Sequence, residues 1–182
     1  MSIVLTVGQA GNAVGAELWE LLCEEKASRA PSGLFRLTGE ARGVMVDSEP
    51  KVMGRLKRNR SLRREAMVCD AGGAGRGNNW AYGYSAGQSA ELQDYPFGTE
   101  PGLVARVMDV VRKEAEACDV YTGCMMLHSV AGGTGSGLGC RLAQEMRDAY
   151  PINYLLSAAI APFDTGDTPM QVRSLACEAP GV

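Results

Sequence analysis

Four glycines and two hydroxyl side chains occupy the seven residues "AGGTGSG", from Ala131 to Gly137. An apolar run predicts a strand before this segment, and an amphipathic pattern predicts a helix after it. Backbone N–H groups in such a loop, with the positive end of a helix behind them, form a cradle for an anion. The hydroxyls of Thr134 and Ser136 add hydrogen-bond donors. The segment therefore predicts a phosphate-binding loop rather than a flexible linker.

The positive charge that would balance a phosphate does not come from a lysine in this loop. No G-K-[ST] sequence follows the glycines, and no glycines have the G-x-G-x-x-G spacing. The helix dipole, a metal ion or both must then supply it. Asp47 and Glu49, two residues apart after a predicted strand, offer the oxygen ligands that Mg²⁺ prefers. The alternative for this pair is a solvated turn in which Asp47 bonds to its own backbone.

Several polar or glycine-rich loops are expected at the same edge of a sheet. They are residues 9–12, 47–50, 75–79, 129–137 and 164–168. In an open α/β sheet the carboxyl ends of the strands form one edge, where ligands bind. Five loops at that edge predict a ligand with several distinct parts, such as a nucleotide. Gln9, just beyond the first strand, is placed to contact a phosphate or a metal-bound water.

Three other features favour structural interpretations. His128, the single histidine of the chain, is interpreted as hydrogen-bonded and structural rather than catalytic. The seven basic residues from Lys51 to Arg64 are interpreted as a solvated loop or a partner contact, since no aromatic residues interleave for base stacking. Trp80, Tyr82 and Tyr84 are expected to pack internally, with an interface as the alternative.

The elements that must position these residues alternate along the chain. Strands are predicted at residues 2–7, 44–50, 123–128 and 152–162, and helices at 12–26, 101–119 and 138–150. Asn12 is predicted to cap the first helix. Alternation of strands and helices implies parallel pairing through right-handed crossovers. The predicted fold class is therefore α/β, a mainly parallel sheet flanked by helices.

The composition narrows the class of protein. The 182 residues suffice for a domain with a buried core, and 46% hydrophobic with 21% charged residues is ordinary for a soluble protein. A net charge of −3 gives no general attraction to nucleic acid or to an anionic membrane. The six cysteines form no C-x-x-C pair, which predicts neither a zinc site nor a disulfide framework. The first residues lack the pattern of a signal peptide, so we expect a cytosolic setting.

Four motifs occur in the order in which the tubulins carry them. They are Gly8–Asn12 with Gly15 and Trp19, Val46–Pro50, Gly77–Ala81 and Ala131–Gly137. They span nearly the whole chain, which is therefore identified as a member of the tubulin family. The segment "WAYGYS" is most similar to the delta branch, which is associated with centrioles, basal bodies and cilia. The resemblance implies a Rossmann-like tubulin nucleotide-binding domain.

The resemblance also implies a ligand, GTP or GDP with Mg²⁺. Gln9 and Glu49 would belong to the magnesium and phosphate region, with Asp47 as a second metal ligand. Asn78 would lie near the terminal phosphate, and Asp167 matches a position that contacts the ribose. The implied nucleotide contacts are Gln9, Asn12, Glu49, Gly77, Asn78, Ser129, Gly132, Gly133, Thr134, Gly135 and Asp167.

The sequence departs from the family pattern at several places, among them a shorter segment between Asn12 and Asp47 and a longer one from Ser85 to Pro101. Ala13 stands where many tubulins have a glutamine near the guanine. Arg76 occupies a small-residue position, where it either adds a phosphate contact or crowds one. The sequence stops before the long central helix of the family, so we expect residues 1–182 to be an N-terminal part of the domain, incomplete at its C-terminal side and marginally stable. Because the family completes hydrolysis with a neighbouring subunit, the isolated chain is expected not to turn over GTP.

Two functions from different classes follow as hypotheses. The first is a GTP-binding cytoskeletal protein of the cytoplasm, centriole, basal body and cilium, with the nucleus as a further location. Its partners would be other tubulins or centriolar proteins, and neither nucleic acid nor a membrane. The alternative is a truncated, nucleotide-free interaction module that modulates full-length tubulins or centriolar proteins. A self-sufficient phosphohydrolase is disfavoured, since the sequence offers no evident group to position the attacking water.

Overall fold

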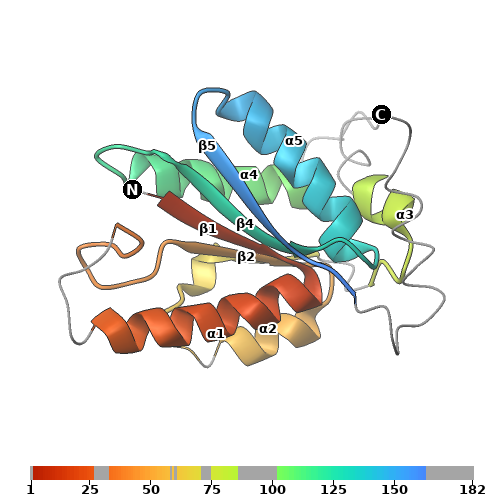
Figure 1. Ribbon diagram of the computed structural model, residues 1–182, viewed down its shortest axis with the longest axis horizontal. Helices are drawn as coiled ribbons and strands as arrows, with labels where there is room; N and C mark the ends of the chain where they lie inside the picture. The colour runs from red at the N-terminus through yellow and green to blue at the C-terminus, as the bar shows by residue number, and fades with distance from the viewer. Residues whose placement is uncertain are drawn as a thin grey trace, which may run out of the picture.

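The computed structural model describes residues 2–26, 33–57, 59, 61–70, 75–85 and 102–162. A five-stranded sheet in the order β3-β2-β1-β4-β5 forms its centre. The strands are β1 (Ser2–Val7), β2 (Gly43–Asp47), β3 (Met67–Cys69), β4 (Gly123–Ser129) and β5 (Tyr154–Ile160). Every pairing is parallel, which confirms the predicted α/β class (Figure 1).

Helices cover both faces of the sheet, as Figure 1 shows. One face carries α1 (Gly8–Lys26) and α2 (Pro50–Leu56), and the other carries α4 (Leu103–Glu116) and α5 (Gly139–Ala149). A short helix, α3 (Trp80–Ser85), lies beside the start of α5. A 3₁₀ turn at Arg64–Ala66 precedes β3, and a π-helical turn at Thr134–Leu138 leads into α5.

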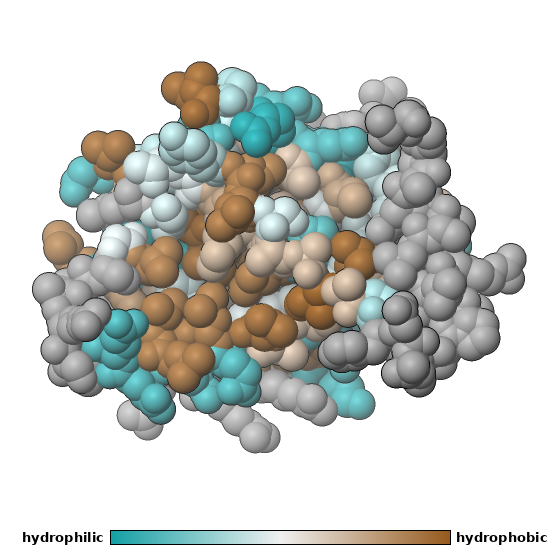
Figure 2. All heavy atoms as spheres, in the orientation of Figure 1, coloured by the Kyte–Doolittle hydropathy of each residue, from teal (hydrophilic) through white to brown (hydrophobic). Residues whose placement is uncertain are grey.

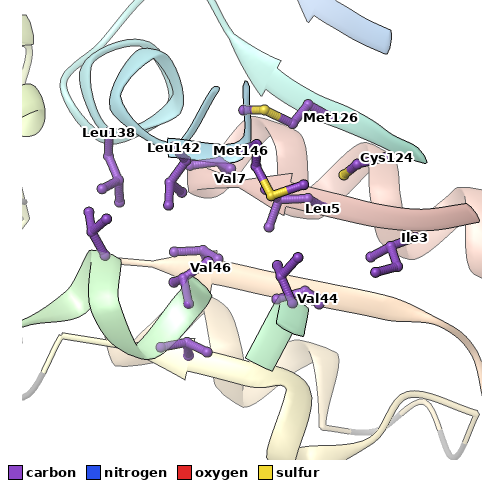
Figure 3. Close-up of a cluster of buried hydrophobic side chains, with 14 of the residues drawn as sticks. Ile3, Leu5, Val7, Val44, Val46, Cys124, Met126, Leu138, Leu142 and Met146 are labelled. Carbon is purple, nitrogen blue, oxygen red and sulfur yellow. The ribbon is translucent and has the colours of Figure 1, made fainter. Parts of the chain in front are cut away.

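The core consists of two layers separated by the sheet, because successive strand residues point to opposite faces. Leu5 and Val7 of β1 pack with Leu138 and Leu142 under α4 and α5 (Figure 3). Val4, from the same strand, packs in the other cluster with Trp19, Phe35, Met45 and Met53. Both faces of β1 and β2 are buried, as is usual for the inner strands of a parallel sheet.

A buried cluster of ion pairs lies at the amino ends of the strands, opposite the edge formed by their carboxyl ends. Glu114 of α4 is fully buried, and its carboxylate contacts the guanidinium groups of Arg36 at 2.9 Å and Arg63 at 2.5 Å. Arg42, immediately before β2, donates to the carbonyl oxygen of Ala117 at 3.2 Å, at the C-terminus of α4. The interpretation of residues 51–64 as a solvated loop or a partner contact was therefore wrong for Arg63, which is paired inside the fold, and the prediction of a loop was wrong for residues 51–56, which belong to α2.

Several elements differ from the sequence predictions in their bounds or were not predicted. The first helix begins at Gly8, so Asn12 lies inside α1 and is not its cap. Pro50 is the first residue of α2, a position that its fixed φ favours, rather than only the end of a strand segment. The strand β3 has three residues and was not predicted, since a run that short carries no measurable period.

The outer strand β5 presents an apolar surface. Its side chains are mostly exposed, with Tyr154 at 83% and Leu156 at 62%. Figure 2 shows hydrophobic residues gathered over β5 and α1 on this face. In the part of the chain that the structure describes, no helix has the length and apolar character needed to cross a membrane.

Candidate functional site

The carboxyl ends of the inner strands surround a cavity of about 470 Å³. The chain forms β1, β2 and β3 in one direction and then adds β4 and β5 on the other side of β1. The ends of β1 and β4 therefore flank a switch point, the usual ligand position in such sheets. The cavity is lined by Gln9, Ala10, Ala13, Asp47, Glu49, Val52, Arg76, Gly77, Asn78, Ser129, Ala131, Gly132, Gly133, Thr134 and Gly135.

Two glycines let the start of α1 lie against the cradle loop and β4. Gly8 has φ +75°, and a Cβ there would lie 2.8 Å from the backbone nitrogen of Gly135. A Cβ on Gly11 would meet the carbonyl group of Leu127 and lie 3.2 Å from the Cα of His128. The N-terminus of α1 is thereby held at the cavity, where its free N–H groups and dipole favour an anion.

Asn12 acts beneath the cavity rather than in its wall. The side chain is buried, accepts a hydrogen bond from the Thr6 hydroxyl at 2.5 Å and donates to the carbonyl oxygen of Val46 at 2.8 Å. Its amide nitrogen also lies 3.5 Å from Oδ2 of Asp47. Asn12 therefore joins α1 to the ends of β1 and β2. It thereby fixes the position of residues 47–50, the acidic loop.

The acidic loop combines a buried carboxylate with an exposed one. Asp47 is 3% exposed, and its Oδ1 accepts the backbone N–H of Glu49 at 3.1 Å. Burial raises the pKa of the Asp47 carboxyl above its usual range, despite the hydrogen bonds that lower it. Glu49 is exposed and extends towards Gly75, and Ser48 forms a 2.7 Å hydroxyl–hydroxyl hydrogen bond with Thr134. The acidic loop and the cradle are thus directly linked.

The acidic pair fits a hard divalent cation held partly by water and phosphate. Among the described residues, no three His, Cys, Asp or Glu side chains gather as a complete metal site. Mg²⁺ commonly uses only one or two carboxylates and takes its other ligands from water and phosphate oxygens. Asp47, whose burial disfavours an uncompensated negative charge, has the chemistry for that role.

Internal hydrogen bonds set the shape of the glycine loop. The Ser129 hydroxyl accepts the N–H of Ala131 at 3.1 Å, and Gly132 has φ +88°. The Ser136 hydroxyl is fully buried and donates to the carbonyl of Gly132. It does not line the cavity, so the expectation that Ser136 adds a donor for the ligand was wrong. Thr134 and Ser129 are the hydroxyl residues of the loop 129–137 that line it.

The second glycine loop, residues 75–79, and helix α3 pack against the glycine loop 131–137, which forms the cradle. A Cβ on Gly133 would be 2.7 Å from the carbonyl oxygen of Gly77, which has φ +55°. A Cβ on Gly137 would be 2.7 Å from the backbone nitrogen of Tyr84. The Asn79 side chain accepts the Tyr82 N–H at 3.0 Å and so caps α3. These glycines bring the two loops into backbone contact.

The structure brings together most of the predicted site residues. Gln9, Asp47, Glu49, Gly77, Asn78, Ser129, Gly132, Gly133, Thr134 and Gly135 all line the same cavity. Asn12 lines an adjoining cavity of about 770 Å³ between α1 and α2, which shares Gln9, Ala13, Glu49 and Val52 with the first. Asp167 and the rest of the loop 164–168 lie outside the described residues. Sequence reasoning missed Ser48, although its place inside the acidic loop was a usable signal.

The residues given structural interpretations occupy structural positions. The imidazole of His128 shares hydrogen bonds with the Ser157 hydroxyl at 2.7 Å and the Ser129 carbonyl at 3.4 Å, outside the cavity lining. Trp80 stacks on Tyr84 with ring centroids 4.8 Å apart, and the Tyr84 hydroxyl donates to Gln144 of α5 at 2.6 Å. Trp80 and Tyr84 thus pack α3 against α5, as expected, whereas Tyr82 is 46% exposed and lies under the guanidinium of Arg76.

A parallel sheet with a glycine loop and two carboxylates at its switch point defines an α/β protein of the nucleotide-binding class. The model of the tubulin/FtsZ family GTPase domain matches residues 2–178. The tubulin beta-1 chain of Mus musculus is 35% identical over 179 residues, which cover 87% of this chain and 37% of that protein. The tubulin beta-8 chain of Oryza sativa subsp. japonica is 36% identical over 176 residues, which cover 85% and 36%.

The chain therefore belongs to the tubulin/FtsZ family and carries the N-terminal part of its GTPase domain. It spans little more than a third of the length of these curated relatives. Both relatives are beta-tubulins, so the finer likeness to the delta branch stays a prediction.

Proposed function

We propose that this protein binds a guanine nucleotide, GTP or GDP, with Mg²⁺ at the carboxyl end of its sheet. The observation that carries the proposal is the convergence of the acidic loop and both glycine loops on one cavity beside the N-terminus of α1. Family membership supports the choice of guanine nucleotide, because the matched domain is a GTPase domain.

Each part of the cavity has a chemical role in this proposal. The N–H groups of Gly132, Gly133 and Gly135 and the Thr134 hydroxyl donate to phosphate oxygens. Asp47 and Glu49 hold Mg²⁺, which neutralises phosphate charge when bound. We propose that Gln9 and Asn78 contact the phosphates or metal-bound water, and that Asp167 contacts the ribose. Asn12 supports the acidic loop from below.

A thermal melt with and without GTP–Mg²⁺ tests the proposal. Ligand at a hundred times its dissociation constant raises the unfolding free energy by about 2.7 kcal/mol. The matched variant is Asn78→Asp, which places a carboxylate near the open side of Gly132 with almost no change in volume. Gln144→Glu makes the same amide-to-carboxylate change outside the cavity and is the control.

We expect GTP–Mg²⁺ to raise the melting temperature of the parent and of Gln144→Glu but not of Asn78→Asp. Equal melting curves with and without nucleotide in the parent contradict the proposal. We further propose that the isolated protein binds without steady-state turnover, since the family completes hydrolysis with a neighbouring subunit. Sustained phosphate release by the monomer contradicts that part.

The role of the whole protein is also proposed at family level. We propose a cytoskeletal protein that associates with other tubulins, and on the likeness of Trp80–Ser85 to the delta branch, one that acts at centrioles, basal bodies and cilia. Immunofluorescence of the endogenous protein tests this location. A signal spread along cytoplasmic microtubules and absent from centrioles would contradict the delta assignment.

A second candidate function rests on the exposed strand β5. Its apolar side chains, Tyr154 and Leu156 among them, provide a surface for a contact with a tubulin chain without any nucleotide. Under this candidate, the protein is an interaction module that modulates full-length tubulins or centriolar proteins. Co-sedimentation with tubulin that is unchanged by Asn78→Asp, together with no thermal shift from GTP, would favour it over nucleotide binding.

A further inference from the structure

Arg76 is a buried cation in the wall of the candidate phosphate cavity. Its side chain is 9% exposed, forms an ion pair with Asp70 and lies over the ring of Tyr82 at 4.7 Å from the centroid. Its Nε is buried and has no hydrogen-bond partner. A desolvated guanidinium N–H without an acceptor is costly, and an anion in the cavity that Arg76 lines would relieve this cost by accepting the hydrogen bond.

The stem of Arg76 begins against the cradle itself. A Cβ on Gly133 would lie 2.6 Å from the carbonyl oxygen of Arg76 and 2.8 Å from its Cβ. Position 133 therefore has no room for a side chain, because the loop that carries Arg76 packs directly against it. The guanidinium is therefore carried by a segment whose position is fixed relative to the phosphate-binding backbone.

Without Arg76, the charged side chains among the described residues that line the cavity would all be negative. Among the described lining residues, Asp47 and Glu49 are the acids and Arg76 is the cation. A nucleoside triphosphate brings more negative charge than a diphosphate, so it gains more from a cation and loses more to two carboxylates. A guanidinium N–H that donates to a phosphate oxygen forms a charge-assisted hydrogen bond, which is stronger than one between neutral groups.

We propose that Arg76 contacts the phosphate chain and makes this site favour a nucleoside triphosphate over a diphosphate. The inference rests on the proposed nucleotide binding and names a residue that sets its specificity. In the ligand-free protein Asp70 holds the guanidinium, and a phosphate oxygen then takes the Nε–H. Asp70 is in this view a positioning residue, since it orients the arginine without contacting the ligand.

A purely structural role for Arg76 makes a different prediction. If the ion pair with Asp70 only tethers the loop 75–79, its loss loosens the cradle for every nucleotide alike. GTP and GDP affinities would then fall by the same factor. The ratio of the two affinities is therefore the readout that separates specificity from loop tethering.

The experiment is isothermal titration calorimetry of the full chain with GTP–Mg²⁺ and GDP–Mg²⁺ at fixed ionic strength. The variants are Arg76→Ala, Arg76→Lys and Asp70→Asn, and the control is Arg112→Ala, which loses two exposed ion pairs on α4. We expect Arg76→Ala to weaken GTP binding about tenfold or more, the value of a charge-assisted hydrogen bond, and GDP binding far less. Arg76→Lys should restore part of the ratio, because it restores the positive charge without the Nε–H donor.

Each outcome decides a different question. Equal losses for GTP and GDP in Arg76→Ala overturn the inference and leave nucleotide binding intact. Failure of the parent to bind either nucleotide overturns both proposals. If Arg76→Ala does not fold, Arg76→Lys decides, since it keeps the positive charge but lacks the Nε–H: a GTP-to-GDP affinity ratio below that of the parent supports the inference, and an unchanged ratio overturns it. Asp70→Asn should lower the ratio as well, because it removes the group that orients the guanidinium.

Discussion

Glu114→Gln is expected to destabilise the protein far more than a typical surface change. The carboxylate is fully buried and faces Arg36 and Arg63, whose side chains are 22% and 16% exposed. Glutamine keeps the shape and one acceptor but removes the charge, which leaves two largely desolvated guanidinium groups uncompensated. Breaking a buried pair in this way costs about 3–5 kcal/mol, against a total stability of about 5–15 kcal/mol for an ordinary domain.

Urea unfolding followed by far-UV circular dichroism measures this effect. The matched control is Glu116→Gln, two residues further along the same helix, where the carboxylate is 61% exposed and pairs with Arg112 at 2.5 Å. Exposed pairs are worth about 0.2–1 kcal/mol, so the control should unfold close to the parent. The difference in unfolding free energy between the two variants reports the effect of burial, because both remove one negative charge from the same helix and both carboxylates pair with arginine.

A loss of less than about 1 kcal/mol in Glu114→Gln would refute the reasoning, because it would equal the value of an exposed pair. It would mean that water reaches Arg36 and Arg63 as soon as the carboxylate is neutralised. A strong dependence of the parent's unfolding free energy on salt concentration would also contradict the reasoning, because salt screens buried charges only weakly.

Three further predictions concern the metal, the thiols and the glycines. Asp47→Asn should abolish the Mg²⁺-dependent part of the thermal shift caused by GTP, measured by melts with Mg²⁺ or with a chelator, and an unchanged shift would exclude Asp47 as a ligand. Burial raises the pKa of Cys124 to about 12 from 9.0, so above pH 9 the unfolded thiol ionises while the folded one keeps its proton. Stability should then fall by about 1.4 kcal/mol per pH unit between these pKa values, and urea midpoints of Cys124→Ala should show a flatter pH profile. Gly137→Ala should cost about 1–3 kcal/mol through overpacking against α3, whereas Gly54→Ala, with open space around its Cβ, should stabilise α2 by about 0.5–1 kcal/mol; chemical denaturation compares them.

The layered fold was predictable because its longer elements carry clear patterns. The apolar positions of residues 103–116 repeat with the period of a helix, and the short, mostly apolar runs at 2–7 and 123–129 are typical of buried strands in a parallel sheet. The helix α3 was not predictable in this way. Its six residues are half aromatic, and they become helical through the Asn79 cap and contacts with α5.

The buried ion pair illustrates a signal that was present and not used. Val107, Val111 and Glu114 lie at helical spacing on one face of α4, and all three are buried. A carboxylate in line with an apolar stripe predicts a buried, paired charge. Its partners, Arg36 and Arg63, come from loops far away in sequence, so their identity required the tertiary structure.

The glycines of the cradle show why local sequence could locate the site but not assign its parts. Gly132 has its open side towards the cavity, as a ligand-binding glycine should. Gly137 is instead small because the backbone of α3 occupies the space of a Cβ, and Gly133 because the Arg76 loop does. In a sequence these glycines are equivalent, since the atoms that exclude a side chain belong to another segment. The density of glycines in "AGGTGSG" therefore reflects two requirements together, a backbone open to phosphate and a backbone packed under two other loops. A variant of any cradle glycine tests ligand binding only when the structure shows which requirement that glycine meets.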